Sequence, residues 1–142
     1  MEQTLERFVR AQKDMYETAR QELLNKKKKS HWMWYIFPQL HGLGHSSTAV
    51  YYSIKDAKEA RAYLAHPLLG KRLRELSDIL LLLPGNDPQA LFGFPDDRKL
   101  RSCMTLFYAV SKEQRFQQVI VKYYRGIHDQ WTLHAMEHEK ER

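Results

Sequence analysis

The feature that most constrains the fold of this chain is the spacing of its apolar residues. In the first segment they stand three or four positions apart, like side chains on one face of a helix. The residues on this face are Leu5, Phe8, Val9, Met15, Tyr16, Ala19, Leu23 and Leu24. The spacing predicts an amphipathic helix from Thr4 to about Asn25, ended by the lysine run at residues 26–29.

In the rest of the chain, residues typical of helix starts and helix ends indicate a series of further helices. Pro67 suits the first turn of a helix. Ser111 stands three residues before Gln114, as in a capping box, and Gly126 suits the end of the helix that follows. Helices are predicted for residues 53–66, 66–83, 95–111, 111–126 and 129–138, with a short helix at 30–37 capped by Ser30 and a helical turn after Asp87. The segment TAVYYSI, residues 48–54, suits either an extended segment or a short helix.

The fold class predicted from these patterns is all-α. We expect a single compact, irregular domain of about six to eight helices over residues 1–142, with residues 1–3 and 137–142 frayed. Cys103 is the only cysteine, so no disulfide forms within the chain and we expect a reducing, cytoplasmic setting. The N-terminal segment lacks the apolar run of a signal peptide. The longest wholly apolar run, Ile79–Pro84, is too short to cross a bilayer, and no membrane partner is expected.

The charge of the chain admits an anionic partner. The formal net charge is +6 and the isoelectric point is near 9.4, which suits nucleic acid or a smaller anion. Four of the charges stand together at Lys26–Lys29. A solvated loop or helix end is the favoured interpretation of this run, so nucleic acid is a partner class that the charge allows without favouring it.

The segment SHWMWYIFPQLHGLGHSS, residues 30–47, combines bulky aromatic residues, histidines and glycines. Trp32 and Trp34 would not share one face of a helix, so at least one should leave the core and form the wall of a pocket. Aromatic rings stack on bases, and the loop amides from Gly42 to Ser47 suit an anion. The candidate ligand-binding residues here are His31, Trp32, Trp34, Phe37, Gln39, Gly42, Gly44 and Ser46. The alternative, given equal weight, is that the aromatic residues belong to the core.

A second candidate cluster lies in FGFPDDRKLRSCMTLF, residues 92–107. Asp97 and Lys99 are the candidate catalytic residues, and Ser102 and Thr105 are candidates to line the same pocket. Capping of a helix and surface ion pairs, each worth about 0–1 kcal/mol, are the interpretation with more weight on residue types alone. No metal site and no cofactor is predicted, because the chain has one cysteine and lacks HExxH and Walker-type motifs.

Five motifs stand in a fixed order along the chain: RFVRAQ, SHWMWYIFPQLHGLGHS, YLAHPLLGKRL, FGFPDDRKLRSCMTLF and a closing F…Y…G…D…TL pattern. Together they resemble the bacterial and fungal family known as domain of unknown function 1810. The similarity runs from about Leu5 to Leu133, nearly the whole chain. It implies an all-helical single domain and carries no established activity.

A more distant similarity is to the NADAR family of NAD- and ADP-ribose-associated proteins, some of which are N-glycosidases. The segments HPLLGKRLRE and MTLFYAVSKEQRFQQVIVKYYRGIHDQWTL match its motifs in order and spacing. The resemblance implies a ligand of the nucleotide or ribosyl class. The chain departs from the NADAR pattern in one respect, since no acidic residue lies between Ser30 and Lys55, where that pattern has a glutamate. An oxocarbenium-like transition state needs a nearby carboxylate or its electrostatic equivalent, and Asp96 or Asp97 could supply it only by folding in from afar.

The function favoured by these observations is binding or processing of a small nucleotide, ADP-ribose or ribosyl-phosphate compound. In the enzymatic version, an N-glycosidase-like hydrolase, Asp97 would stabilise positive charge at the ribosyl carbon and Lys99 would hold a phosphate in a pocket lined by residues 30–47. A nucleic-acid-binding module and a protein-interaction domain without catalysis are the alternatives. The sequence does not choose between a monomer and a homodimer.

Overall fold

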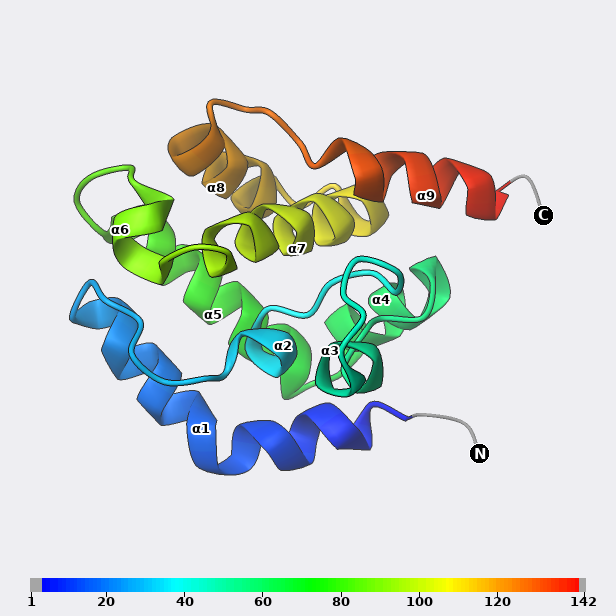
Figure 1. The fold of residues 1–142 in the computed structure, drawn as a ribbon, viewed down its shortest axis with the longest axis horizontal. Coiled ribbons are helices and arrows are strands. Elements are labelled where there is room, and N and C mark those ends of the chain that lie inside the picture. The colour runs from blue at the N-terminus through cyan, green and yellow to red at the C-terminus, as the bar shows by residue number, and fades with distance from the viewer. Residues whose placement is uncertain (1–3, 141–142) are drawn as a thin grey trace.

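The computed structural model describes residues 4–140, with side chains for 4–139, and this part of the chain forms nine helices (Figure 1). They are α1 (Glu6–Leu24), α2 (Met33–Ile36), α3 (Ser47–Tyr51), α4 (Ala57–Ala65), α5 (Leu69–Leu82), α6 (Pro88–Phe92), α7 (Asp96–Ser111), α8 (Gln114–Tyr124) and α9 (Gln130–Lys140). The all-α prediction is confirmed, and the described residues contain no strand beyond an isolated bridge between Leu40 and Ile54.

The helix count exceeds the expected six to eight because the TAVYYSI segment contributes a helix. The Ser46 hydroxyl accepts a hydrogen bond from the Ala49 amide at 3.1 Å and caps the start of α3. The helix ends at Tyr51, and Ile54 then turns extended to pair with Leu40. Both predicted conformations of the segment therefore occur, one in each half.

The helices form two layers around α5 (Figure 1). Helix α1 runs along one side with α2 and α3, and α7, α8 and α9 lie along the opposite side. Helix α5 contacts α1, α4 and α8, while α7 packs against α4, α6, α8 and α9. The long loop from α2 to α3 crosses between the two layers (Figure 1).

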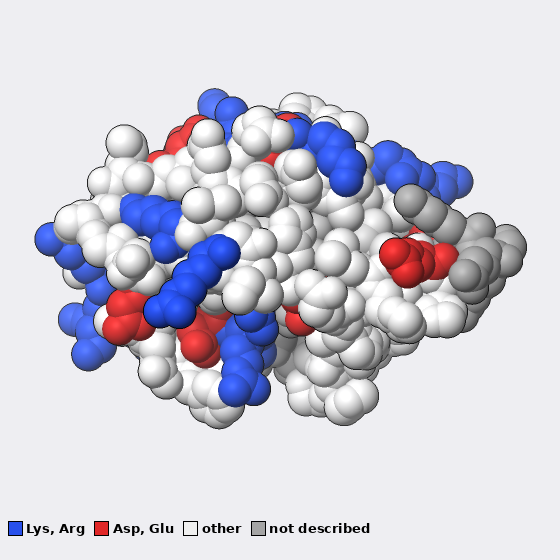
Figure 2. All heavy atoms as spheres, turned by 90° about the horizontal axis from the view of Figure 1, so that it is seen from above, with Lys and Arg blue, Asp and Glu red and all other residues white. Residues whose placement is uncertain are grey.

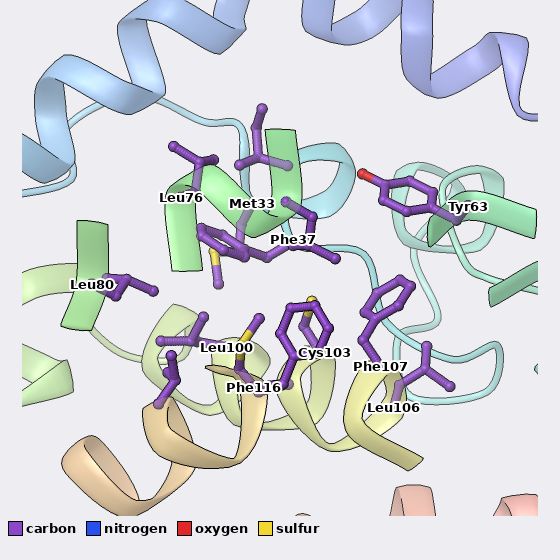
Figure 3. Packing of buried hydrophobic residues seen from close by; sticks show 14 of the residues in the cluster. Met33, Phe37, Tyr63, Leu76, Leu80, Leu100, Cys103, Leu106, Phe107 and Phe116 are labelled. Carbon is purple, nitrogen blue, oxygen red and sulfur yellow. The ribbon is translucent and has the colours of Figure 1, made fainter. Parts of the chain in front are cut away.

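The core lies between α5 and α7 (Figure 3). Leu76 and Leu80 of α5 face Leu100, Cys103 and Phe107 of α7. Burial raises the pKa of the Cys103 thiol well above its usual range, so this cysteine is an inert apolar group rather than a nucleophile. Full burial of each large apolar side chain stabilises the fold by about 1.5–3 kcal/mol, which explains why helices with few caps are stable here.

Two predicted caps are wrong. Ser30 does not cap α2, which begins at Met33 without a side-chain cap. The Ser30 hydroxyl instead donates to the Glu22 carboxylate of α1 at 2.5 Å. Ser111 is not part of a capping box, because its hydroxyl donates to the Phe107 carbonyl at 2.6 Å and accepts from the Glu113 amide at 3.1 Å. Ser30 therefore bonds to another helix, whereas Ser111 bonds to residues close to it in the sequence.

Two further expectations concern the fraying of the chain ends and a membrane-spanning segment. Residues 137–140 belong to α9, and residues 1–3 and 141–142, also expected to fray, lie outside the described range. Among the described residues, no helix combines the length and the apolar character needed to cross a membrane.

Candidate ligand-binding cleft

The aromatic segment is fastened to the end of α1 by one carboxylate. Glu22 accepts hydrogen bonds from the Lys29 amide at 2.7 Å, the Ser30 amide at 2.9 Å and the Trp32 indole Nε1 at 2.9 Å, besides the Ser30 hydroxyl. Burial alone would raise the pKa of Glu22, but the bonds from Ser30, Lys29 and Trp32 outweigh it and lower the pKa to about 2. This Glu22 clasp directs Trp32 into the core and thereby fixes the start of α2.

The two tryptophans of the segment consequently have different surroundings. Trp32 has no exposed surface and packs against Phe37 and Phe92. Trp34 is only half-buried and lines a cleft of about 560 Å³ between the α2–α3 loop, α3 and the first turns of α7. That volume lies in the range of small-molecule sites. The expectation that one tryptophan leaves the core therefore agrees with the structure.

The lining of this first cleft combines flat or apolar surface with cations and hydroxyls. Its residues are Trp34, Gln39, Leu40, Leu43, Gly44, His45, Ser46, Ala49, Tyr52, Ser53, Pro95, Arg98, Lys99 and Ser102. Arg98 and Lys99 are the fixed positive charges, and this set of described lining residues includes no carboxylate. Such a cleft suits a ligand that has both a flat ring and an anionic group.

Lys99 is held in place by an ion-pair chain. Its Nζ lies 3.2 Å from Asp96 Oδ1 and 5.1 Å from the centre of the Trp34 ring. Asp96 shares its other oxygen with Lys28, whose Nζ is 2.8 Å away. Lys28 is nearly buried, with 7% of its side chain exposed, and its Nζ also donates to the Ser30 carbonyl at 2.6 Å. The lysine run is therefore not a uniformly solvated polycation, because one of its members links the Glu22 clasp to the cleft.

The floor of the cleft is tied to the start of α9. The Ser102 hydroxyl lies 3.1 Å from Asp129 Oδ2 and 3.2 Å from the Arg98 carbonyl. Asp129 also accepts from the Thr132 amide at 3.2 Å, which makes it the cap of α9. Ser102 is accordingly held by its neighbours, and among the described residues its side-chain partners are the Arg98 carbonyl and the Asp129 carboxylate, with no histidine.

Six of the twelve candidate site residues line this cleft. They are Trp34, Gln39, Gly44, Ser46, Lys99 and Ser102. Trp32, Phe37 and Thr105 are instead fully buried, and the Thr105 hydroxyl accepts from the Asp129 amide at 3.0 Å. These three residues belong to the packed interior and do not line the cleft.

The other three candidates lie elsewhere. His31 is exposed outside the cleft lining, and Gly42 packs against Trp131. The main-chain carbonyl of Asp97 accepts a hydrogen bond from the Tyr124 hydroxyl of α8. Burial and the nearby Asp97 charge raise the pKa of Tyr124. Among the described residues, Asp97 Oδ1 has no hydrogen-bond partner, and the residue does not line the cleft.

Sequence reasoning missed Arg98, His45 and Tyr52. Arg98 stands beside Lys99 and was obscured by the charge-rich helix start, while its guanidinium lies 4.8 Å from the Phe94 ring. Tyr52 comes from the segment whose conformation was ambiguous, and no signal in its surroundings marks it as a wall of the cleft. His45 follows Gly44 in the loop, so its place in the cleft could have been inferred from its neighbour.

The surface charge does not form one broad basic face in the view of Figure 2. Several Lys and Arg side chains lie in the left part of this view, next to Asp and Glu, others lie along the upper right edge, and a wide uncharged area separates the two groups. A nucleic-acid-binding surface usually shows a basic patch or stripe. On the described part of this face, the positive charge is therefore dispersed rather than gathered for a polyanion.

The fold and the cleft together define a class: a small all-helical domain with a cation-bearing ligand cleft. The family model described as "Protein of unknown function (DUF1810)" matches residues 2–136, so the chain belongs to this family. The structure is similar to the crystal structure of a conserved hypothetical protein from Mycobacterium tuberculosis, with 44% identity and a TM-score of 0.92. The match covers 94% of this chain and 96% of that one. No curated protein matches the chain.

Proposed function

We propose that the first cleft binds a small phosphorylated compound of the nucleotide or ribosyl-phosphate class. The observation that carries the proposal is the pairing of Arg98 and Lys99 with Trp34 and Tyr52 around one cleft of about 560 Å³. Cations bind the phosphate, and a planar ring packs against the aromatic side chains. The distant NADAR similarity points to the same ligand class.

The charge around Lys99 supports anion binding. Lys28, Lys99 and Arg98 contribute three positive charges against the carboxylates of Asp96 and Asp97 in the first turn of α7, so one positive charge remains. The remaining excess lies at the first turn of α7, whose helix dipole adds to the positive potential. A phosphate there receives charge-assisted hydrogen bonds, each worth about 1.5–3 kcal/mol.

The proposal is limited to binding. Hydrolysis of an N-glycosidic bond needs a carboxylate against the ribosyl carbon. The described residues that line the cleft include no Asp or Glu, and the carboxylate of Asp96 is shared between Lys28 and Lys99. Asp97, the sequence-based candidate, does not line the cleft, and its charge acts on Tyr124. A receptor or sensor for the compound therefore fits the cleft better than a hydrolase does.

Isothermal titration calorimetry tests the proposal with inorganic phosphate, adenosine 5′-monophosphate (AMP) and adenosine. AMP should bind more tightly than inorganic phosphate or adenosine alone. Lys99→Gln should weaken AMP binding about tenfold or more, because one charge-assisted bond is lost. Trp34→Ala should weaken AMP but leave inorganic phosphate unchanged, because phosphate needs no ring.

The matched control is Lys13→Gln, which removes one exposed positive charge from α1 and leaves the cleft intact. It should keep the AMP affinity of the wild type. Equal affinities in the wild type, Lys99→Gln and Arg98→Gln would show that the cleft is not the anion site. A weakening of AMP binding by Lys13→Gln equal to that by Lys99→Gln would point to diffuse charge instead.

A further inference from the structure

A second cleft, of about 550 Å³, opens beside the first. Leu40 lines both clefts, so only a short stretch of chain separates them. The second cleft also includes His41, Asp56, Trp131 and Glu139. None of these four was assigned a role by the sequence motifs or by the proposed function.

The ridge between the clefts is a rigid part of the chain. The His41 amide donates to the Ile54 carbonyl and the Ile54 amide donates to the Gln39 carbonyl, both at 2.8 Å. Ser53 reinforces the ridge, because its hydroxyl donates to the Val50 carbonyl at 2.7 Å and lies 3.2 Å from His41 Nδ1. Since the Ser53 proton is already used, the hydrogen-bond network assigns a proton to His41 Nδ1, which leaves Nε2 as an acceptor in the neutral ring.

Trp131 provides a stacking surface in the second cleft. Its indole rests on Gly42, where an added Cβ would lie 2.8 Å from Cη2 and 3.1 Å from Cζ2. Gly42 also has a φ of +110°, so the position requires glycine for both space and backbone conformation. Trp131 nevertheless keeps 43% of its surface exposed. A large aromatic ring that is supported on one side and open on the other suits the face of a sugar or a base.

The two clefts have opposite charge. The first presents Arg98 and Lys99, whereas the second presents the carboxylates of Asp56 and Glu139 beside Lys55. Both carboxylates are held at the start of α4: Asp56 accepts from the Glu59 amide at 2.8 Å, and Glu139 accepts from the Ala57 amide at 3.0 and 3.1 Å. Carboxylates repel a phosphate but accept hydrogen bonds from sugar hydroxyls, as acidic residues do from ribose in dinucleotide sites.

We infer that a single extended ligand occupies both clefts, with its phosphates in the first and a hydroxyl-rich second ring stacked on Trp131. The chemical class is a nucleoside diphosphate joined to a further sugar. The sugar hydroxyls donate hydrogen bonds to Asp56, Glu139 and His41 Nε2. The opposite charges of the two clefts determine which end of the ligand enters each cleft. The inference rests on the proposed function, because it keeps the phosphates of the ligand against Arg98 and Lys99 in the first cleft.

Calorimetry with AMP, ADP-ribose and UDP-glucose tests the inference. Both diphosphate sugars should bind the wild type more tightly than AMP, by about tenfold for one stacked ring. Trp131→Ala should reduce their affinity about tenfold and leave the AMP affinity unchanged. Trp131→Phe should restore most of the loss, which a general structural defect would not allow. His41→Ala should also weaken the diphosphate sugars alone.

The control is Ile127→Ala, which shortens an exposed side chain in the loop before α9 and lies outside both clefts. It should bind all three compounds like the wild type. Equal affinity for AMP and the diphosphate sugars, unchanged in Trp131→Ala, would overturn the inference while leaving the first cleft as the AMP site. AMP binding that is insensitive to Lys99→Gln would overturn the proposed function and the inference with it.

Discussion

Replacement of Glu22 by glutamine tests whether one carboxylate fastens the aromatic segment to α1. Four hydrogen-bond donors converge on this group, and its pKa is lowered from an ordinary 4.5 to about 2. A full shift of this size would correspond to about 3.4 kcal/mol, at 1.36 kcal/mol per pKa unit. Because Glu22 is partly exposed, solvent screening reduces the expected loss in Glu22→Gln to roughly 1–2 kcal/mol.

Removal of the whole group should cost more. In Glu22→Ala, the Trp32 indole N–H is left without its acceptor inside the core, which adds about 1–3 kcal/mol. Urea unfolding followed by circular dichroism measures both changes. A loss of 2 kcal/mol corresponds to roughly 6 °C in Tm for a chain of this length. The matched control is Glu17→Gln on the exposed face of α1, which should change the free energy of unfolding by less than about 0.5 kcal/mol.

The pH dependence gives an independent check of the same reasoning. The folded-state pKa of Glu22 is lowered, so its stabilisation is fully present above the unfolded value of 4.5 and is lost as the pH falls towards 2. The difference in stability between the wild type and Glu22→Gln should therefore be constant above about pH 5.5 and shrink below it. A difference that is the same at pH 3 and pH 7, or that is absent at pH 7, would refute the clasp.

Three further substitutions test other contacts. Arg7→Met breaks a buried ion pair of 3.0 Å with Glu59 and should cost about 3–5 kcal/mol in urea unfolding; a loss below 1 kcal/mol would contradict its burial. Gly42→Ala forces a methyl group against Trp131 at positive φ and should lower the free energy of unfolding by roughly 1–3 kcal/mol. An unchanged Tm in differential scanning calorimetry would contradict this contact. Lys28→Met leaves the carboxylate at the start of α7 to Lys99 alone, so the AMP affinity should fall about fivefold in titrations; an unchanged affinity would remove Lys28 from the electrostatics of the first cleft.

The helices could be predicted from the sequence because their signals are local. Apolar spacing located α1, and Asp87 and Asp56 cap α6 and α4 near the predicted starts. The family could be recognised because its motifs are long and stand in order. The Ser30 cap failed for the opposite reason, since its hydroxyl bonds to a carboxylate on another helix. The Ser111 cap failed although its partners are local, because the hydroxyl bonds back to the Phe107 carbonyl one helical turn earlier.

The site could be predicted only in part, because the residues that line the cleft come from distant segments. Trp34 and Lys99 were found through residue type, and the packing of α7 beside the α2–α3 loop brings them together. The orientation of Asp97 was not predictable, because a helix start gives the position of a side chain without the neighbour that it faces. Trp131 approaches Gly42 from the last helix, a contact that no local pattern indicates.

The three tryptophans are intrinsic fluorescent probes in three different surroundings. Trp32 is enclosed in the core, Trp34 lines the first cleft and Trp131 lies open in the second. Their fluorescence emission should differ in wavelength and in access to a soluble quencher, with Trp131 the most accessible. Variants that keep one tryptophan at a time would follow unfolding, entry of the phosphate end and arrival of the second ring as three separate signals from one molecule.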